Sequence, residues 1–243
     1  MQPEARGEQP LESGARRVLV TGGSGAIGSD IVRALCRQGW SVTANFAHDE
    51  LRAKALQNET GCALFQADVG DENAVEAMFA ETGFHAVVHA AGVVRDALLL
   101  RQSVEQWRET LRVNADGAFL VTRAALQNLA DGGRLILLAS RVGQSGSVGQ
   151  SSYSASKAAV IALMKCAARE GGDLGICVNA ICPGLVPSSL TEPLNELRLE
   201  ELRNRSVFHR LGTGSEVAGA VQWLISAEAA GVSGQVVHCD SRF

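Results

Sequence analysis

An apolar run, a glycine-rich turn and an amphipathic helix follow one another near the start of the chain. Residues 17–21 (RVLVT) predict a buried β-strand, and residues 22–28 (GGSGAIG) form the turn. Apolar side chains then recur at helical spacing through Ile31, Val32 and Leu35. Glycines in such a turn let the backbone approach a phosphate, and the following helix offers free N–H groups. This order predicts a βαβ unit that binds a dinucleotide at the turn.

The alternation of strand and helix continues along the chain. Further strand patterns lie at residues 40–46, 62–66, 86–89, 134–139, 176–181 and 235–239. Helical patterns lie between them, at residues 49–58, 71–80, 103–130, from 151 onward and at 215–226. Such alternation implies parallel strands with both faces of the sheet covered. We therefore expect a single Rossmann-type doubly wound α/β domain, with about seven parallel strands and helices on both faces.

Three regions of the chain are expected to differ in character. Residues 1–15 are polar and rich in Gly, Pro and Glu, which is typical of a flexible tail. Residues 16–243 are expected to form the single dinucleotide-binding and catalytic domain. Within it, residues 185–212 contain two polar helical pieces and are interpreted as a substrate loop or lid.

Composition argues against several classes of function. The net charge is −4 with both signs interspersed, which disfavours nucleic acid as a partner. No apolar run approaches the ~18 residues that a transmembrane helix needs, and the N-terminus lacks a signal-peptide pattern. The 6 cysteines have neither CxxC nor His-linked spacing. We therefore expect a cytoplasmic protein without a membrane partner, a metal site or a disulfide framework.

Three residues suggest proton transfer. Tyr153 and Lys157 are four positions apart on a predicted helix, so their side chains share one face. A neighbouring ammonium favours the phenolate and is expected to lower the phenol's pKa from about 10. Ser140, after the fifth predicted strand, adds a hydroxyl for the same substrate oxygen. The alternative explanation is a chance Tyr-x-x-x-Lys spacing on a solvated helix.

The full set of motifs resembles the classical short-chain dehydrogenase/reductase family. Besides the glycine turn, Ser140, Tyr153 and Lys157, the resemblance is carried by Asp68, Ala91-Gly92, Asn114 and Pro183-Gly184. Their order and spacing extend over residues 16–240. Within the family, the sequence is most similar to 3-oxoacyl-[acyl-carrier-protein] reductases, through residues 95–101 (RDALLLR), 113–119 (VNADGAF), 149–153 (GQSSY) and 210–212 (RLG).

The resemblance implies a role for each of these residues. Tyr153 would donate a proton to a carbonyl oxygen as hydride arrives from the nicotinamide, and Lys157 would lower the phenol's pKa and hold the ribose. Ser140 would orient the substrate oxygen. Asn114 would anchor a water that refills the proton through Lys157; the alternative is an asparagine that only bonds backbone. The implied cofactor-binding residues are Gly22, Ser24, Gly25, Ala26, Ile27, Gly28, Asn45, Phe46, Asp68, Val69, Ala91, Gly92, Tyr153, Lys157, Pro183, Gly184, Val186 and Ser188.

The end of the second predicted strand bears on the cofactor. NAD enzymes of this fold place a carboxylate there to bind the ribose 2′-hydroxyl. This strand instead ends Asn45-Phe46-Ala47, and Asp49 comes later. The missing carboxylate leaves room for a 2′-phosphate, so NADPH or NADP is expected, with NADH as the alternative. Gly25 stands where many NADP-linked relatives carry a basic residue.

Some positions depart from the family pattern. Ala26 replaces a glycine, and residues 89–92 (HAAG) replace the usual paired asparagines, as in polyketide ketoreductases. Residues 238–243 lack the glycine pair that usually follows the aspartate. Asp131 and Leu174 align with docking arginines of acyl-carrier-protein reductases, and losing two cations weakens capture of an acidic carrier. Arg134 and Arg169 are candidates to compensate.

These features predict NADPH-dependent reduction of a 3-oxoacyl thioester, linked to an acyl carrier protein or coenzyme A, in fatty acid or polyketide-like biosynthesis. One alternative is a dehydrogenase or reductase of a free small alcohol or ketone. Another is a non-catalytic dinucleotide-binding protein, against which the complete set of site residues argues. The resemblance also implies a homotetramer or dimer formed through the two long helices. Trp107 and Phe119 are interpreted as core or subunit interface.

Overall fold

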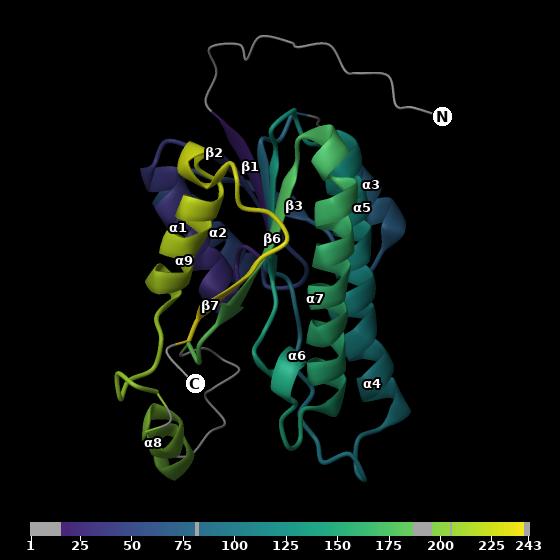
Figure 1. Cartoon of the computed structure of the whole chain (residues 1–243), viewed down its shortest axis with the longest axis vertical. Coiled ribbons are helices and arrows are strands. Elements are labelled where there is room, and N and C mark those ends of the chain that lie inside the picture. The colour runs from purple at the N-terminus through teal and green to yellow at the C-terminus, as the bar shows by residue number, and fades with distance from the viewer. Residues whose placement is uncertain (1–15, 81–82, 187–195, 205, 241–243) are drawn as a thin grey trace.

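A seven-stranded parallel sheet with the order β3-β2-β1-β4-β5-β6-β7 forms the centre of the protein. The structure is a computed structural model that describes residues 16–80, 83–186, 196–204 and 206–240. The strands are β1 (Arg17–Thr21), β2 (Ser41–Phe46), β3 (Ala63–Gln66), β4 (Ala86–His89), β5 (Arg134–Leu138), β6 (Cys177–Pro183) and β7 (Val236–Cys239). Helices cover both faces of this sheet (Figure 1). The predicted doubly wound α/β fold is confirmed.

The two helical layers bury separate apolar clusters against the sheet. Helices α1 (Ala26–Arg37), α2 (Glu50–Thr60) and α9 (Gly214–Leu224) lie on one face, and α3 (Glu72–Phe79), α5 (Gly117–Asn128) and α7 (Ser151–Glu170) lie on the other (Figure 1). Alternate residues of one strand serve the two layers. Val18 and Val20 pack toward α1 and α9, whereas Leu19 packs toward α5 and α7. Burial on both faces explains why the strands are continuously apolar.

Side-chain caps fix where several helices begin. Asp49 accepts a hydrogen bond from the Arg52 N–H at the start of α2, and Asp71 accepts one from Ala74 at the start of α3. Thr213 forms a capping box at the start of α9. Such residues satisfy N–H groups that a helix leaves without partners, so they set the first turn. The predicted helices accordingly begin within two residues of the observed ones.

The helix predicted over residues 103–130 is not continuous. It consists of α4 (Val104–Leu111), a π-helical turn at Arg112–Asp116 (η1) and α5. A π-turn accommodates one extra residue in the helix and commonly marks a functional site. Hydrophobic periodicity did not reveal this insertion, because the apolar pattern on either side is helical.

The predicted lid is described only in part. Residues 196–204 form α8 (Glu196–Asn204), and the Gly212 N–H donates to the Leu185 carbonyl at 2.9 Å, which joins the two ends of the segment. Residues 1–15, most of the segment before α8 and Ser188 lie outside the described residues. In the described ranges, no helix is long and apolar enough to cross a membrane. Those same ranges contain no group of three His, Cys, Asp or Glu side chains able to hold a metal ion.

Candidate active site

The predicted site residues meet at the carboxyl-terminal edge of the sheet. The chain leaves β1 toward β2 but leaves β4 toward β5, and β1 pairs directly with β4. This reversal of strand order opens a crevice beyond the strand ends, which is where doubly wound sheets bind ligands. The glycine turn follows β1, Ala91-Gly92 follow β4, Ser140 follows β5 and Gly184 follows β6. The topology therefore brings the sequence motifs together at one edge.

Two glycines make the turn after β1 tight enough to lie against β4. Gly22 has a φ of 63°, and a Cβ placed on it would lie 2.7 Å from the Ala91 Cα. A Cβ on Gly28 would lie 2.2 Å from the Gly22 carbonyl oxygen. Only glycine fits at either position. Ala26, where relatives have glycine, is the first residue of α1, and a helical position accommodates its methyl group.

The start of α1 offers N–H groups to an anion. Its N-cap is Gly25, which has no side chain to satisfy them, and the first turn bond runs from Ser29 N–H to the Gly25 carbonyl at 2.8 Å. The N–H groups of residues 26–28 precede that bond and belong to the set without intrahelical partners. With the dipole of α1 behind them, they suit a phosphate.

The Asn45 side chain, predicted to bind cofactor, has its hydrogen-bond partners within the protein. It is buried, accepts a hydrogen bond from the Gly22 N–H at 3.3 Å and donates to the Ala67 carbonyl at 2.9 Å. The amide therefore ties the end of β2 to the glycine turn and to the segment after β3. Asn45 is placed to hold the turn in position, because its polar atoms already have partners inside the protein.

The side chains after β2 and β3 that were predicted to bind cofactor are buried or paired within the protein. The side chains of Phe46 and Val69 are buried, and Val69 packs closely against Gly117. The Asp68 carboxylate pairs with the Arg112 guanidinium at 2.8 Å, and its other oxygen accepts from the Gly70 N–H at 2.8 Å. The Arg112 hydrogen bond holds the pKa of Asp68 below its usual range. The carboxylate is therefore charged and largely neutralised by Arg112.

Tyr153 and Lys157 on α7 come together with Ser140, which follows β5. The Ser140 hydroxyl hydrogen-bonds the Tyr153 phenol. The Lys157 ammonium is buried, donates to the Leu138 carbonyl at 2.8 Å and lies 5.8 Å from the centroid of the Tyr153 ring. The last turn of β5 and the first two turns of α7 thus form one polar cluster.

Burial controls the protonation of this cluster. It raises the pKa of Tyr153 to about 12, against a smaller lowering by the Ser140 hydrogen bond. Burial also lowers the pKa of Lys157 to about 8. For the chain by itself, the net shift of the phenol's pKa is therefore upward, opposite to the lowering expected from Lys157, because burial outweighs the other causes. The physical reason is that desolvation disfavours both charged forms, and the ammonium is directed at a carbonyl of β5.

Asn114 is fully buried in the π-turn. Its Oδ1 accepts from the Val93 N–H at 2.8 Å, and its Nδ2 donates to the Val93 carbonyl at 2.9 Å and to the Ser156 hydroxyl at 3.0 Å. The side chain therefore bonds backbone, as one interpretation expected, but that backbone belongs to the loop after β4. A Cβ on Gly92 would lie 3.2 Å from Asn114 Oδ1 and 3.5 Å from Lys157 Nζ. The missing side chain at Gly92 lets its backbone lie close to these two polar groups.

Several contacts at the site were not anticipated from the sequence. Gln150 Nε2 donates to both carboxylate oxygens of Asp96 at 3.2 Å, and the Ala97 N–H donates to the Gly149 carbonyl at 2.9 Å. The Ser151 hydroxyl donates to Gln102 at 2.6 Å. These bonds fasten the loop after β4 to the start of α7. The sequence showed only that both segments contain motifs of the family pattern. That observation gives no information about contact between them.

His89 is buried at the end of β4, where relatives have asparagine. Its Nδ1 lies 2.8 Å from the Thr21 hydroxyl, so it links β4 to β1. Burial lowers the pKa of His89 to about 3, with a smaller contribution from Lys157. The imidazole is therefore neutral near neutral pH.

The loop after β6 completes the edge. The Gly184 N–H donates to the Cys239 carbonyl at 2.9 Å, and Val186 is buried. A Cβ on Gly184 would lie 3.1 Å from the Asp240 Cα. Pro183 is therefore the last residue of β6, and Gly184 follows it beside the end of β7. Ser188 lies beyond the described part of this loop.

Sequence comparison finds relatives that match nearly the whole chain. Residues 22–241 match a family model described as "Enoyl-(Acyl carrier protein) reductase". Acetoacetyl-CoA reductase of Rhizobium meliloti (strain 1021) is 36% identical over 234 residues, which cover 93% of this chain and 97% of the relative. The 3-oxoacyl-[acyl-carrier-protein] reductase FabG of Staphylococcus aureus (strain N315) is 35% identical over 235 residues, with 92% and 96% covered.

Two solved structures have a similar fold over most of the chain. BdcA in complex with NADPH has a TM-score of 0.89 at 28% identity, and 94% of each chain is covered. A dehydrogenase/reductase from Sinorhizobium meliloti 1021 also has a TM-score of 0.89, at 31% identity, with 95% of this chain and 96% of that chain covered. The motifs, their meeting at the switch point and these similarities lead to one conclusion: the chain is an oxidoreductase that belongs to the short-chain dehydrogenase/reductase family, close to the 3-oxoacyl-[acyl-carrier-protein] reductases.

Proposed function

We propose that this protein reduces a 3-oxoacyl thioester to the 3-hydroxyacyl thioester with NADPH. The observation that carries the proposal is the half-buried phenol of Tyr153, which bonds Ser140 and stands beside Lys157 at the switch point. A phenol with a pKa of about 12 holds its proton at neutral pH. Reduction of a carbonyl needs a protonated donor at the oxygen, so this state suits the reductive direction.

The proposed chemistry divides between the cofactor and the chain. When bound, the reduced nicotinamide supplies the hydride. The Tyr153 and Ser140 hydroxyls bind the substrate's carbonyl oxygen, and donors fixed at that oxygen stabilise the negative charge that develops on it. Tyr153 then gives up its proton. The Lys157 ammonium favours the resulting phenolate, and its position beside Gly92 also places it to hold a ribose.

The crevice fits a dinucleotide. Gly22 and Gly28 remove side chains where a pyrophosphate would approach, and the N-terminus of α1 faces that place. Charge near the end of β2 supports NADPH. Asp49 caps α2 and pairs with Arg52 at 3.3 Å, and Asp68 is paired with Arg112. A 2′-phosphate at this end would therefore not meet an uncompensated carboxylate from either residue.

Two relatives support a thioester substrate. By their names, acetoacetyl-CoA reductase and 3-oxoacyl-[acyl-carrier-protein] reductase both act on 3-oxoacyl thioesters. These names support the same substrate class here. A place in fatty acid or polyketide-like biosynthesis, and a location in the cytoplasm, form part of this proposal.

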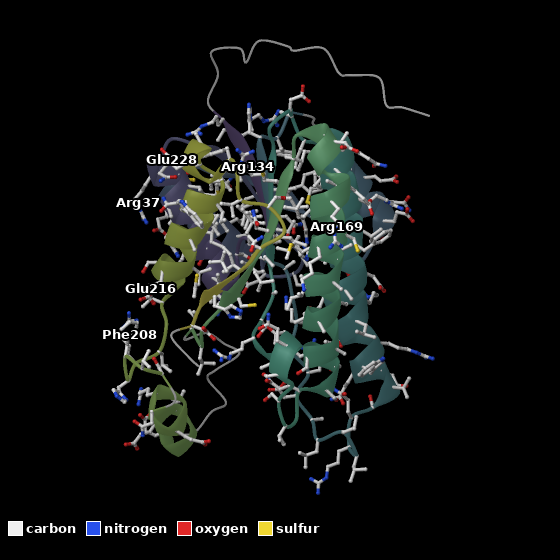
Figure 2. The ribbon with its side chains drawn as sticks, viewed as in Figure 1. Arg37, Arg134, Arg169, Phe208, Glu216 and Glu228 are labelled. Carbon is white, nitrogen blue, oxygen red and sulfur yellow. The ribbon has the colours of Figure 1, made fainter. Side chains whose placement is uncertain are left out.

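The choice between carriers depends on the two candidate cations. Arg134 donates to the Gly132 and Gly133 carbonyls, so its guanidinium is held against its own turn. Arg169 is exposed on α7 and is the better candidate (Figure 2). It lies sixteen residues beyond Tyr153, about 24 Å along the helix. A carrier bound at Arg169 would be remote from Tyr153 of the same chain, so coenzyme A thioesters are the substrates to test first.

The test follows NADPH absorbance with acetoacetyl-coenzyme A as substrate. NADH, a free cyclic ketone and an enoyl thioester are run in parallel, with Tyr153→Phe as the matched variant. Turnover of the 3-oxoacyl thioester with NADPH, lost in Tyr153→Phe while NADPH still binds, supports the proposal. Turnover of the free ketone alone, or of the enoyl thioester alone, would overturn the proposed substrate class.

A further inference from the structure

A partly buried ion pair lies next to Ser140. Arg141, the residue after Ser140, has its Nη1 2.8 Å from Oδ2 of Asp240, the residue after β7. The Asp240 side chain is only 4% exposed, whereas the Arg141 side chain is 29% exposed. The two residues are 99 positions apart in the sequence. The pair therefore joins the end of β5 to the last described residue of the chain.

The segment that carries Ser140 is held from two sides. A Cβ on Gly143 would lie 2.7 Å from the Lys157 carbonyl carbon, so α6 (Val142–Ser145) lies directly on the backbone of α7. Arg141 provides a second contact, through Asp240. The residues that directly follow Ser140 are thus held both by α7 and by an ion pair to the end of β7.

Asp240 also contacts the loop after β6. Its Cα would lie 3.1 Å from a Cβ on Gly184, and the Gly184 N–H donates to Cys239. β7 is the last strand in the sheet order, so its far side has no neighbouring strand in the described sheet. The Arg141 contact therefore connects this short edge strand and the Pro183-Gly184 loop to the serine segment.

The two partners are not equivalent. A carboxylate that is almost fully buried is costly unless it is paired, and removing its cation leaves an uncompensated charge. Arg141 is partly exposed, so water compensates it better when the carboxylate is removed. Removing the Arg141 cation should therefore be more damaging than removing the Asp240 carboxylate.

We propose that Arg141 and Asp240 are positioning residues that fix the Ser140 hydroxyl against the Tyr153 phenol. The inference rests on the proposed role of Ser140, and neither residue of the pair contacts the reacting atoms. If the pair served only the fold, its removal would lower stability and leave catalysis unchanged. A positioning pair acts through Ser140, so its effect on catalysis disappears when the serine hydroxyl is absent.

The test uses the full chain and a set of variants. These are Arg141→Met, Arg141→Lys, Asp240→Asn and the double variant Arg141→Met/Asp240→Asn, with the first also made in a Ser140→Ala background. The kcat and KM are measured with whichever carbonyl substrate the wild type reduces fastest. Binding of NADPH and thermal unfolding are measured in parallel, so that a loss of fold is recognised.

Arg141→Met is expected to lower kcat by about tenfold to a hundredfold, because a displacement of about 1 Å has effects of that size. NADPH affinity should change far less than kcat, because the pair does not touch the glycine turn and its contact with Gly184 is made by Asp240, which this variant keeps. Arg141→Lys should keep most of the activity. The double variant should recover activity relative to Arg141→Met, because it no longer buries an unpaired carboxylate. If Arg141→Met does not fold, kcat is instead compared between the wild type, the double variant and Arg141→Lys.

The Ser140→Ala background shows whether the ion pair acts on catalysis through the serine hydroxyl. There, Arg141→Met should have no further effect on kcat. An equal loss in both backgrounds, or wild-type kcat in Arg141→Met, would overturn the proposal.

A second readout needs no substrate, because Tyr153 is the single tyrosine of the chain. Arg141→Met should weaken the Ser140 bond and raise the alkaline titration midpoint of the phenol, as Ser140→Ala does. An unchanged midpoint in Arg141→Met, with a shift in Ser140→Ala, would contradict the proposal even if the thioester is not a substrate.

Discussion

The Lys157 ammonium donates to the Leu138 carbonyl at 2.8 Å and lies 5.8 Å from the centroid of the Tyr153 ring. Lys157 is therefore anchored to the end of β5, and the phenol's direct partner is Ser140. In the chain itself the phenol is an acid protected by burial. Its proton becomes labile only when charge at the site changes, which connects proton transfer to binding at the crevice.

This arrangement predicts how the single tyrosine titrates. The Tyr153 pKa of about 12 means that the phenol should stay mostly protonated at about pH 11, where an exposed tyrosine with a pKa of about 10 is ionised. Oxidised nucleotide should lower the midpoint, because its positive ring favours the phenolate. The measurement is ultraviolet absorbance against pH. Ionisation with an ordinary midpoint in the folded protein would contradict the structure.

A second prediction concerns acid stability and His89. The folded pKa of about 3 lies below the ordinary value of 6.5, so the unfolded chain binds more protons between these values. Stability should therefore rise with pH across this window and be lost as the pH falls below about 6.5. At about pH 5 the loss from this group is about 2 kcal/mol. His89→Asn should remove that part of the pH dependence in urea unfolding. Parallel pH profiles for the two proteins would argue against a buried neutral imidazole.

Asn45 should matter for nucleotide binding without contacting the nucleotide through its side chain. Asn45→Ala leaves the Gly22 N–H and the Ala67 carbonyl without this partner, at a cost of about 1–3 kcal/mol for each buried group. We expect lower stability and NADPH binding weakened by about tenfold or more. Gln66→Ala, which removes an exposed bond to the Ala47 carbonyl at the same sheet edge, is the control and should have little effect. Equal NADPH affinity in Asn45→Ala would show that the turn holds without the amide.

Cofactor preference should respond to a carboxylate at the end of β2. Ala47→Asp places one directly after the strand, where it would repel a 2′-phosphate and accept from a 2′-hydroxyl. We expect kcat/KM for NADPH relative to NADH to fall by at least about tenfold, or about 1.4 kcal/mol. Ala47→Asn has the same shape without the charge and is the matched control. A similar ratio in both variants would place the 2′-group elsewhere.

Assembly is proposed to involve the helix predicted over residues 103–130, which contains α4 and α5, together with α7. Trp107 is 36% exposed and Phe119 is 48% exposed, so neither belongs to the core of this chain. Exposed aromatic side chains on adjoining helices are typical of a subunit interface. Phe119→Glu should therefore reduce the sedimentation coefficient of the wild-type oligomer. Leu51→Glu, at a site 83% exposed on α2, is the control and should leave it unchanged. A monomeric wild type would refute the proposed assembly.

Much of the fold was predictable because its determinants are local. The apolar run at residues 17–21 specified β1, and Asp49 and Asp71 marked where α2 and α3 begin. The glycines of the first turn were predictable for the same reason, since only they fit a backbone this close to its neighbour. The parallel sheet followed from the alternation of strands with helices.

The sequence alone determined the alternation of strands and helices, the parallel sheet and the glycine turn, and it indicated the residues of the proposed site. The tertiary structure decided what those residues do there. It placed the Asn45 amide on the turn, put Asn114 in a π-turn against Val93 and paired Arg141 with Asp240. It also reversed the expected shift of the Tyr153 pKa. The physical reason is that propensity and periodicity act over a few residues, whereas burial and hydrogen-bond partners depend on segments that meet only when the chain is packed.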